Sequence, residues 1–137
     1  MTEDKIDIKS LNFTELQKLL EEMGEKKFRA KQLYEWIHKR LVLSFDEMTN
    51  LSKDMRKKLD ESCTIEGARI IKKQVSSDGT AKFLMRLSDG NTVESVLMKY
   101  KHGNSVCIST QVGCRMGCRF CASTVGGLIR SLKTSEM

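Results

Sequence analysis

The sequence contains no apolar run that approaches the roughly 20 residues that a membrane-spanning helix needs. Residues 1–7 are mostly polar or charged and lack the apolar stretch of a secretory signal. The chain has five cysteines, and an odd number of cysteines without an export signal favours a reducing compartment, where they act as metal ligands or reactive thiols more often than as disulfide partners. We therefore expect a cytoplasmic protein that has no membrane partner.

Phosphate-binding loops of the familiar kinds are also missing. Gly126 and Gly127 stand together, but neither a Lys-Ser/Thr pair nor G-x-G-x-x-G spacing accompanies them, so we interpret them as a turn. The 24 Lys and Arg residues exceed the 18 Asp and Glu residues, which gives a net charge of +6. This excess fits a polyanionic partner such as RNA, although many basic proteins bind no nucleic acid, and the charge alone leaves both possibilities open.

The cysteines are unevenly distributed, and three of them form a compact motif. Cys114, Cys118 and Cys121 have the order C-x3-C-x2-C, and no fourth cysteine follows at a matching short spacing. Three thiolates on one tight loop can hold three irons of a cubane cluster and leave the fourth iron with an open position. This pattern is typical of a cluster that binds S-adenosylmethionine and cleaves it to a radical.

Residues 1–65 predict a small helical bundle. Asn12 or Thr14 can cap a first helix that ends at Gly24, a second helix covers residues 28–39, and a third covers residues 52–62. Lysines and arginines occupy the polar faces of this bundle: Lys26, Lys27, Arg29, Lys31, Lys53, Arg56, Lys57 and Lys58. They form either a solvated surface or a contact with an RNA backbone, which needs cations on one shared face.

Residues 66–103 predict a three-stranded antiparallel meander. The apolar runs 69–75, 82–87 and 92–99 are separated by Asp78-Gly79 and Asp89-Gly90, and Asp-Gly between such runs is a strong hairpin signal. We expect a polar linker at residues 100–104 and then a short strand, residues 106–110, that leads into the cysteine loop. The short strand, the cysteine loop and Thr134 as a helix cap together predict that residues 104–137 form the first part of a β/α barrel. A complete barrel of this kind needs about 200 residues. The expected fold class is α+β, with the barrel truncated.

Four segments of the chain resemble the radical S-adenosylmethionine adenine-C2 RNA methyltransferases, dual-specificity enzymes that act on 23S rRNA and tRNA. They are Phe28-Arg29-Ala30-Lys31-Gln32-Leu33, Val93-Glu94-Ser95-Val96, residues 107–114, and Gly127-Leu128-Ile129-Arg130-Ser131-Leu132. The cysteine motif alone would identify only the superfamily. Glu94 and Cys107, at their distances before the motif, make the resemblance specific to this family.

The resemblance implies a role for each matching residue. Cys114, Cys118 and Cys121 would hold a 4Fe-4S cluster, whose free iron would chelate S-adenosylmethionine, the cofactor that carries the hard chemistry. Cys107 would take the proton from adenine C2 and form a transient disulfide that frees the product. Glu94 would accept a proton or hold the adenine by its exocyclic amine. From the residues alone, Cys107 could equally be a buried core cysteine, and Glu94 an exposed strand carboxylate.

The resemblance also implies partners and leaves alternatives. The partners are 23S rRNA, tRNA and an electron donor for the cluster, and we expect a monomer. The methyl-carrying cysteine and most of the S-adenosylmethionine pocket would lie beyond Met137, so we expect the isolated chain to be inactive. An alternative is a basic RNA-binding module braced by zinc on Cys107, Cys114, Cys118 and Cys121. Cys63 is expected to be a small buried hydrophobe and His102 an ordinary loop residue.

Overall fold

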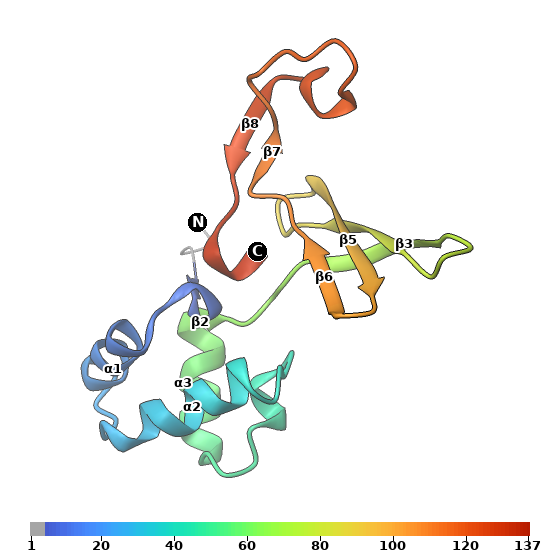
Figure 1. The fold of residues 1–137 in the computed structure, drawn as a ribbon. Helices are drawn as coiled ribbons and strands as arrows, with labels where there is room; N and C mark the ends of the chain where they lie inside the picture. Colours follow the sequence, from blue (N-terminus) through green and yellow to red (C-terminus); the bar gives the residue numbers. More distant parts are fainter. Residues whose placement is uncertain (1–4) are drawn as a thin grey trace. The chain divides into compact units, whose positions relative to one another are not determined.

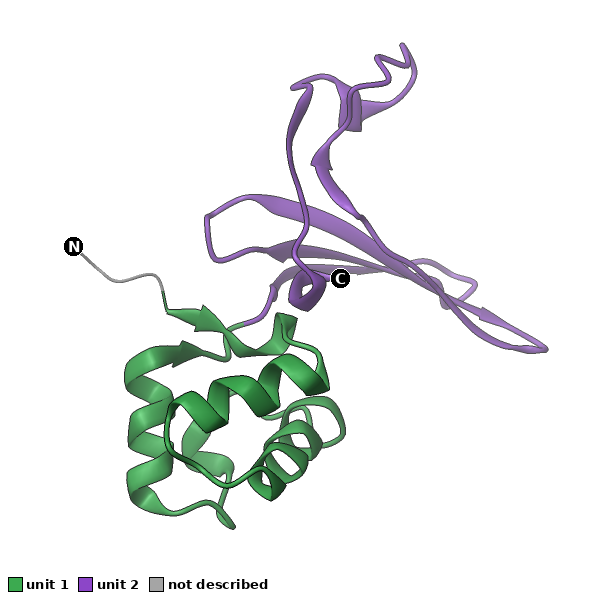
Figure 2. Ribbon diagram, turned by 90° about the vertical axis from the view of Figure 1, so that its left-hand side faces the viewer, with its two compact units in different colours: residues 1–66 green, residues 67–137 purple. Residues whose placement is uncertain are grey.

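The fold is described from a computed structural model, which covers residues 5–137. Residues 1–4, part of the segment that we interpreted as lacking a signal sequence, lie outside the described residues. Contacts divide the chain into two compact units, one up to Glu66 and one from Gly67 onward (Figure 2). One boundary expected from the sequence, at 65/66, adjoins this division, and the other, at 103/104, falls inside a β-hairpin.

Unit 1 is built from short helices that pack around one core (Figure 1). Its helices are α1 (Phe13–Glu22), α2 (Phe28–His38) and α3 (Lys53–Ser62), with 3-10 turns η1 (Ile8–Ser10) and η2 (Phe45–Glu47). The short strands β1 (Ile6–Asp7) and β2 (Cys63–Thr64) pair in parallel and bring the two ends of the unit together. The three helices expected from the sequence are confirmed, whereas this pair of strands was not predicted.

The helix boundaries follow from local hydrogen bonds. The Asn12 side chain accepts from the Glu15 backbone N–H at 3.0 Å, and the Glu15 carboxylate accepts from the Asn12 N–H at 2.7 Å. This reciprocal capping box satisfies two backbone donors that a helix start would otherwise leave without partners. Gly24, at φ +76°, ends the first helix as expected. Ser52 caps α3 in the same way as Asn12 caps α1, by accepting from the Met55 N–H at 3.2 Å.

The core of unit 1 is apolar and continuous. Its largest fully buried side chains are Ile8, Leu16, Leu20, Leu33, Ile37, Met48, Met55, Leu59 and Cys63. Cys63 is 1% exposed, as expected for a small buried hydrophobe, and burial raises the pKa of its thiol to about 11. Phe28, the first residue of α2, is 55% exposed.

Unit 2 consists of β-strands (Figure 1). In residues 67–137, β3 (Arg69–Val75), β4 (Ala81–Arg86), β5 (Thr92–Tyr100) and β6 (Gly103–Cys107) form an antiparallel sheet in chain order. A separate antiparallel hairpin pairs β7 (Gln111–Gly113) with β8 (Leu128–Ser131). The 3-10 turns η3 (Ala122–Thr124) and η4 (Thr134–Glu136) complete the unit. A small core of Leu87, Val93, Val112 and Leu132 joins the sheet to the hairpin.

The structure confirms the α+β class and both Asp-Gly hairpins but corrects the path after β5. The expected linker at residues 100–104 is wrong, because β5 continues to Tyr100 and β6 begins at Gly103. The meander therefore has a fourth strand, which pairs Val96 with Cys107. Around the cysteine loop, the described residues form antiparallel rather than parallel pairs. Thr134 opens a three-residue turn whose N-cap is Lys133.

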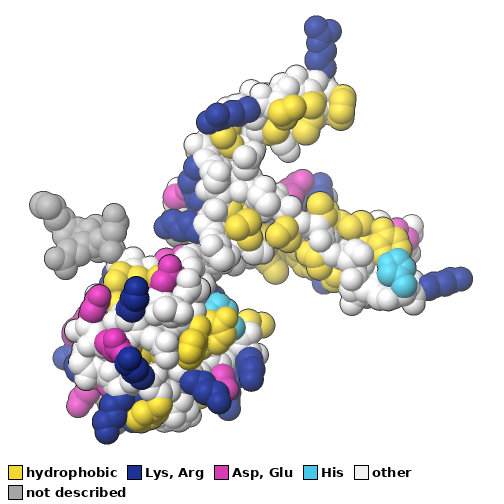
Figure 3. All heavy atoms as spheres, turned by 60° about the vertical axis from the view of Figure 1, so that its left-hand side comes forward, with side chains coloured by type: hydrophobic (Ala, Val, Ile, Leu, Met, Phe, Trp, Pro, Cys, Tyr) yellow, Lys and Arg dark blue, Asp and Glu magenta, His cyan; other side chains and the backbone are white. Residues whose placement is uncertain are grey.

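The surfaces of the two units differ in character. Lys and Arg are interspersed with Asp and Glu over the visible face of unit 1 in Figure 3, whereas hydrophobic side chains gather over the visible face of unit 2. Exposed apolar residues of unit 2 include Ile70, Val106 and Ile108. Among residues 5–137, no helix is both long and apolar enough to cross a membrane.

One charged cluster anchors the last residues of unit 2. The Arg130 guanidinium donates to Asp89 at 2.7 Å and, in a bidentate pair, to Glu136 at 2.7 and 2.8 Å. These hydrogen bonds tie the β4–β5 turn to β8 and to η4. Hydrogen bonding from Arg130 is the main reason why the pKa of Asp89 and the pKa of Glu136 lie below their ordinary values.

The first prediction concerns the core of unit 1. Leu33 is fully buried, so Leu33→Ala should lower the free energy of unfolding of this unit by about 2–5 kcal/mol through lost burial and a residual cavity. Leu43 is 72% exposed, and Leu43→Ala should change the same quantity by no more than about 0.5 kcal/mol. Urea unfolding followed by circular dichroism measures both, and equal losses would contradict the assigned core.

The second prediction concerns acid stability. Because folding lowers the pKa of Asp89 and of Glu136, their ionised forms stabilise unit 2 above their ordinary pKa values of 3.8 and 4.5. This contribution should be lost as pH falls from these values towards the lowered ones. Arg130→Met should remove most of this pH dependence, whereas Arg86→Met should retain it. Thermal unfolding between pH 2 and 6 measures the effect, and identical profiles for the two variants would refute it.

Candidate active site

The register of the sheet places two expected site residues on one face. Cys107 of β6 lies directly opposite Val96 of β5, and Glu94 is two residues from Val96 along the same strand. Cross-strand partners and residues two apart share a face, so the side chains of Glu94 and Cys107 both extend from it. They are diagonal neighbours, a relation that places such residues roughly 7–8 Å apart.

This face forms one side of an open depression of about 670 Å³ in unit 2. Its lining includes Glu94, Cys107 and Cys114, together with residues 108–111 and 122–123. The sheet face and the base of the cysteine loop therefore border the same space. Cys118 and Cys121 are not among the residues that line it.

Cys107 is exposed, which rules out a buried core role for it. Glu94 is also accessible, and its carboxylate lies 3.1 Å from the Lys82 ammonium of β4. At this level of exposure, such an ion pair contributes at most about 1 kcal/mol to stability, but it restrains the direction of the carboxylate. Ser109 donates a hydrogen bond of 2.7 Å to the Glu94 backbone carbonyl and so holds the segment after β6 against β5.

Lys82 and Ser109 were not identified from the sequence. The sequence places Lys82 in a predicted strand. Only the register between β4 and β5 shows that its ammonium group meets the Glu94 carboxylate. Ser109 lies just beyond β6, where we had expected the strand to continue. Both positions depend on pairing between segments separated in sequence, which periodicity does not report.

The cysteine loop is closed at its base by the β7–β8 hairpin. The Cys114 N–H donates to the Gly127 carbonyl at 3.0 Å, next to Gly113, whose φ is +76°. A Cβ at Gly113 would lie 1.9 Å from the Gly127 carbonyl oxygen. Glycine is therefore required at position 113 both for its backbone conformation and for the close approach of two chains. Gly127, interpreted from the sequence as part of a turn, supplies the other side of this contact.

The Thr124 hydroxyl organises the far part of the loop. It donates to the carbonyls of Cys118 and Cys121 at 3.1 and 2.9 Å, and the Cys121 N–H donates to the Cys118 carbonyl at 3.1 Å. These bonds fix the backbone between the second and third cysteine. Cys114, Cys118 and Cys121 are all free and partly exposed.

The donor set suits an iron–sulfur cluster, since three free thiols share one short loop that is anchored at both ends. In residues 5–137 no three His, Cys, Asp or Glu side chains are gathered closely enough to hold a metal ion. Ligation would therefore involve a rearrangement of the cysteine side chains within the loop. His102 stacks on Tyr100 with ring centroids 5.1 Å apart, which fits its interpretation as a loop residue.

The third prediction compares two glycines of this loop. Gly113 and Gly117 both have positive φ, so alanine at either should strain the backbone by about 1–2 kcal/mol. Only at Gly113 would the new Cβ also meet a neighbouring backbone atom, whereas nothing lies within 4 Å at Gly117. Gly113→Ala should therefore destabilise unit 2 clearly more than Gly117→Ala. Thermal unfolding of both variants measures this, and equal effects would refute the close approach.

Both units of the chain are similar to known proteins. Residues 6–65 match the family described as ribosomal RNA large subunit methyltransferase N-terminal domain. A probable dual-specificity RNA methyltransferase RlmN of Lachnoclostridium phytofermentans is 63% identical over 98% of this chain and 38% of its own length. The RlmN of Staphylococcus aureus is 55% identical over 98% of this chain and 37% of its own length.

A solved structure gives the same result for the fold. The crystal structure of a radical SAM methyltransferase from Sphaerobacter thermophilus matches with a TM-score of 0.87 and 36% identity, over 96% of this chain and 39% of that protein. This chain thus spans less than two-fifths of the length of these relatives. Over nearly its whole length this chain is similar to one part of the RlmN relatives, and its residues 6–65 match the N-terminal domain family of ribosomal RNA large subunit methyltransferases.

Proposed function

We propose that this chain forms part of an enzyme that methylates C2 of adenine in 23S rRNA and tRNA, with S-adenosylmethionine as the methyl source. The observation that carries the proposal is the shared depression, in which Glu94 and Cys107 face the base of the cysteine loop. Sequence similarity supports it, because the matching relatives are named as probable dual-specificity RNA methyltransferases. A zinc-braced binding module without catalysis has no such support.

Cys114, Cys118 and Cys121 would hold a 4Fe-4S cluster by their thiolates. Such a cluster supplies the electron that cleaves S-adenosylmethionine and starts radical chemistry. Other residues of this chain would hold the cysteine loop in position. The contact between Gly113 and Gly127 closes the loop, and the bonds from Thr124 hold the backbone between Cys118 and Cys121.

Glu94 and Cys107 would act on the target base. In the depression, the Glu94 carboxylate can accept a hydrogen bond from the exocyclic amine of adenine or accept a proton. Cys107 is exposed on the same sheet face as Glu94 and is its diagonal neighbour on the adjacent strand. It would act as a thiolate that takes the C2 proton. Its thiolate would then attack the sulfur of a methyl-carrying cysteine outside this chain, so that a transient disulfide forms as the carbon–sulfur bond to the modified base breaks and the released carbon takes up a proton to become the methyl group.

The remaining parts of the proposal concern domains and partners. Unit 1 would contact the RNA, and the segment that follows β6, residues 108–137, would begin the radical S-adenosylmethionine barrel. The enzyme would act as a monomer in the cytoplasm and take electrons from a separate donor. Adenine in a folded RNA must leave its stack to reach the depression, as with other enzymes that modify bases.

The fourth prediction tests the reaction in a chimera. Residues 1–137 would replace the matching region of the Staphylococcus aureus relative, and adenine C2 methylation of rRNA and tRNA would be measured by mass spectrometry in cells that lack the native enzyme. The chimera should methylate both RNAs. Cys118→Ala should abolish methylation, and Cys107→Ala and Glu94→Gln should each reduce it by about 10²–10⁴-fold, the usual effect of removing a general acid or base.

Cys63→Ala is the matched control, because it removes a cysteine that is buried in unit 1 and has no contact with the depression. It should lower stability without loss of methylation at a temperature at which the chimera is folded. Iron and sulfide analysis after anaerobic reconstitution separates the two candidate functions. A colourless chimera with stoichiometric zinc, or full activity of Cys118→Ala, would overturn the proposal.

A further inference from the structure

The turn between β5 and β6 (Figure 1) carries two aromatic rings that lie outside the lining of the candidate active site. Tyr100 ends β5, and Lys101 and His102 form the turn that leads to its cross-strand partner Gly103 in β6. The rings of Tyr100 and His102 are stacked, with centroids 5.1 Å apart and an angle of 8° between their planes. Tyr100 is 52% exposed, and His102 is also exposed. A stacked aromatic pair is therefore accessible at the end of this hairpin.

Local contacts hold the two rings in place before any ligand arrives. The Tyr100 hydroxyl donates to the Met98 sulfur at 3.4 Å, and this bond fixes the direction of the ring along β5. Gly103, opposite Tyr100, has no side chain that would cover the ring from β6. Apart from its chain neighbours, no atom of residues 5–137 lies within 4 Å of the place that a Cβ on Gly103 would occupy. The rings are thus positioned in advance, which lowers the entropic cost of binding.

The aromatic pair begins on the same sheet face as the candidate active site. Alternate residues of a strand share a face, so Glu94, Met98 and Tyr100 all extend from one face of β5. Cys107 lies on this face as well, opposite Val96. With a rise of about 3.3 Å per residue, Glu94 and Tyr100 are about 20 Å apart along the strand. An RNA whose target adenine lies in the depression can thus reach the rings only with another nucleotide.

The charge of this part of the chain favours a polyanion. Residues 95–135 contain no Asp or Glu, whereas Lys and Arg recur among them. Lys99 and Lys101 flank Tyr100 in the sequence, and both are exposed. A nucleotide matches both features of the turn, because its base can stack on aromatic rings and its phosphate can approach the lysines. An acidic peptide would match only the charge.

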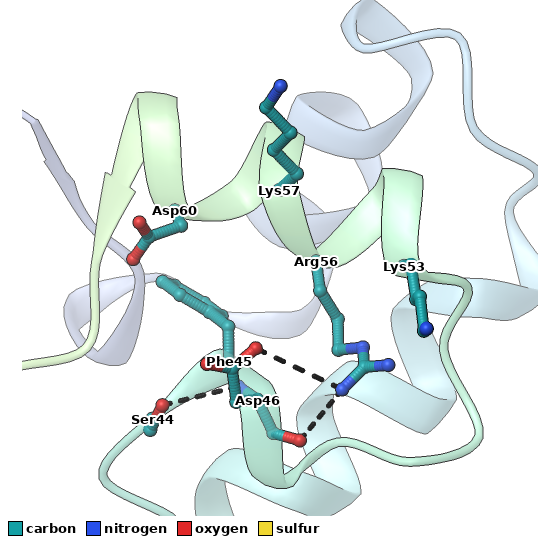
Figure 4. A pocket seen from close by; sticks show the side chains of 7 residues that line it. All are labelled: Ser44, Phe45, Asp46, Lys53, Arg56, Lys57 and Asp60. Carbon is teal, nitrogen blue, oxygen red and sulfur yellow. Dashed lines mark hydrogen bonds and ion pairs between the residues drawn. The ribbon is translucent and has the colours of Figure 1, made fainter.

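A depression in unit 1 has a different character (Figure 4). It has a volume of about 420 Å³ and lies between η2 and α3. Among the described residues that line it, Phe45 is the only aromatic one, and it is 4% exposed. The Arg56 guanidinium in the same lining donates to the Asp46 backbone carbonyl at 2.8 Å. A base would find no open ring face there, which makes the Tyr100–His102 pair the better base contact.

We propose that Tyr100 and His102 form a stacking platform for one unpaired base of the RNA substrate. This inference rests on the proposed function for the identity of the RNA. Proteins recognise RNA loops through bases that have left their stack and lie against aromatic side chains. The platform would hold a nucleotide near the target adenine while the adenine itself occupies the depression. Every base has a flat face, so this contact would set the position of the RNA rather than select its sequence.

The fifth prediction uses two single-stranded probes of equal length. One is oligouridylate, whose bases stack little on one another, and the other is an abasic ribose-phosphate oligomer. Fluorescence anisotropy measures the binding of each probe to residues 1–137. The chain should bind oligouridylate about tenfold more tightly, because only this probe can stack on the rings. Tyr100→Leu and His102→Ala should each remove most of this preference and leave binding of the abasic oligomer nearly unchanged.

Two control variants separate the aromatic rings from other effects. Tyr100→Phe keeps the ring and loses only the hydroxyl that donates to Met98, so it should retain the preference. His38→Ala removes the histidine of a similar pair in unit 1, where its ring centroid lies 4.3 Å from that of Tyr34. This variant should also retain the preference. Thermal unfolding followed by circular dichroism identifies the variants that are folded.

A second measurement tests the platform without any substitution. The ring-proton NMR signals of Tyr100 and His102 should move upfield on addition of oligouridylate, because a stacked base shields them. The same signals should stay in place on addition of the abasic oligomer. Neither measurement depends on methylation, so failure of the chimera would leave this inference standing.

Two results would overturn the platform. One is a folded Tyr100→Leu variant that retains the full preference for oligouridylate. The other is equal binding of both probes by the unaltered chain, which would show that phosphates alone hold the RNA. If the chimera methylates RNA in either case, the proposed function stands and only the platform falls.

Discussion

Antiparallel pairing of β5 with both its neighbours is the constraint on which the candidate site depends. On one side of β5, the register with β6 places Cys107 opposite Val96. On the other side, the pairing with β4 brings Lys82 to Glu94. A shift of one residue would turn Glu94 or Cys107 to the other face of the sheet and separate them. The two Asp-Gly turns and the tight β5–β6 turn hold this register, so local turn chemistry determines whether the side chains of Glu94 and Cys107 share a depression.

The second constraint is the close approach of Gly113 to Gly127, which closes the loop of residues 114–126 at its base. Loop closure carries an entropic cost, and the hairpin of β7 and β8 supplies the hydrogen bonds that offset it. The small core of Val93, Val112 and Leu132 then fixes this hairpin against the sheet. The cysteine loop is thus attached to the same sheet that presents Glu94 and Cys107.

The two units differ in how much apolar surface they bury. Unit 1 buries a continuous apolar core and leaves its charges outside, so its surface is available for contact with a polyanion. Unit 2 has a small core and many exposed apolar residues.

The sequence by itself determined the helices of unit 1, both Asp-Gly hairpins and the grouping of three cysteines, because capping residues, periodicity and spacing are local signals. It did not determine the β1–β2 pair, the fourth strand β6 or the β7–β8 hairpin, and a linker was expected where β5 turns into β6. Those features depend on pairing between segments whose partners lie elsewhere in the chain. Tertiary structure alone decided that Cys107 is exposed and that Lys82 meets Glu94, because each results from which strands lie side by side.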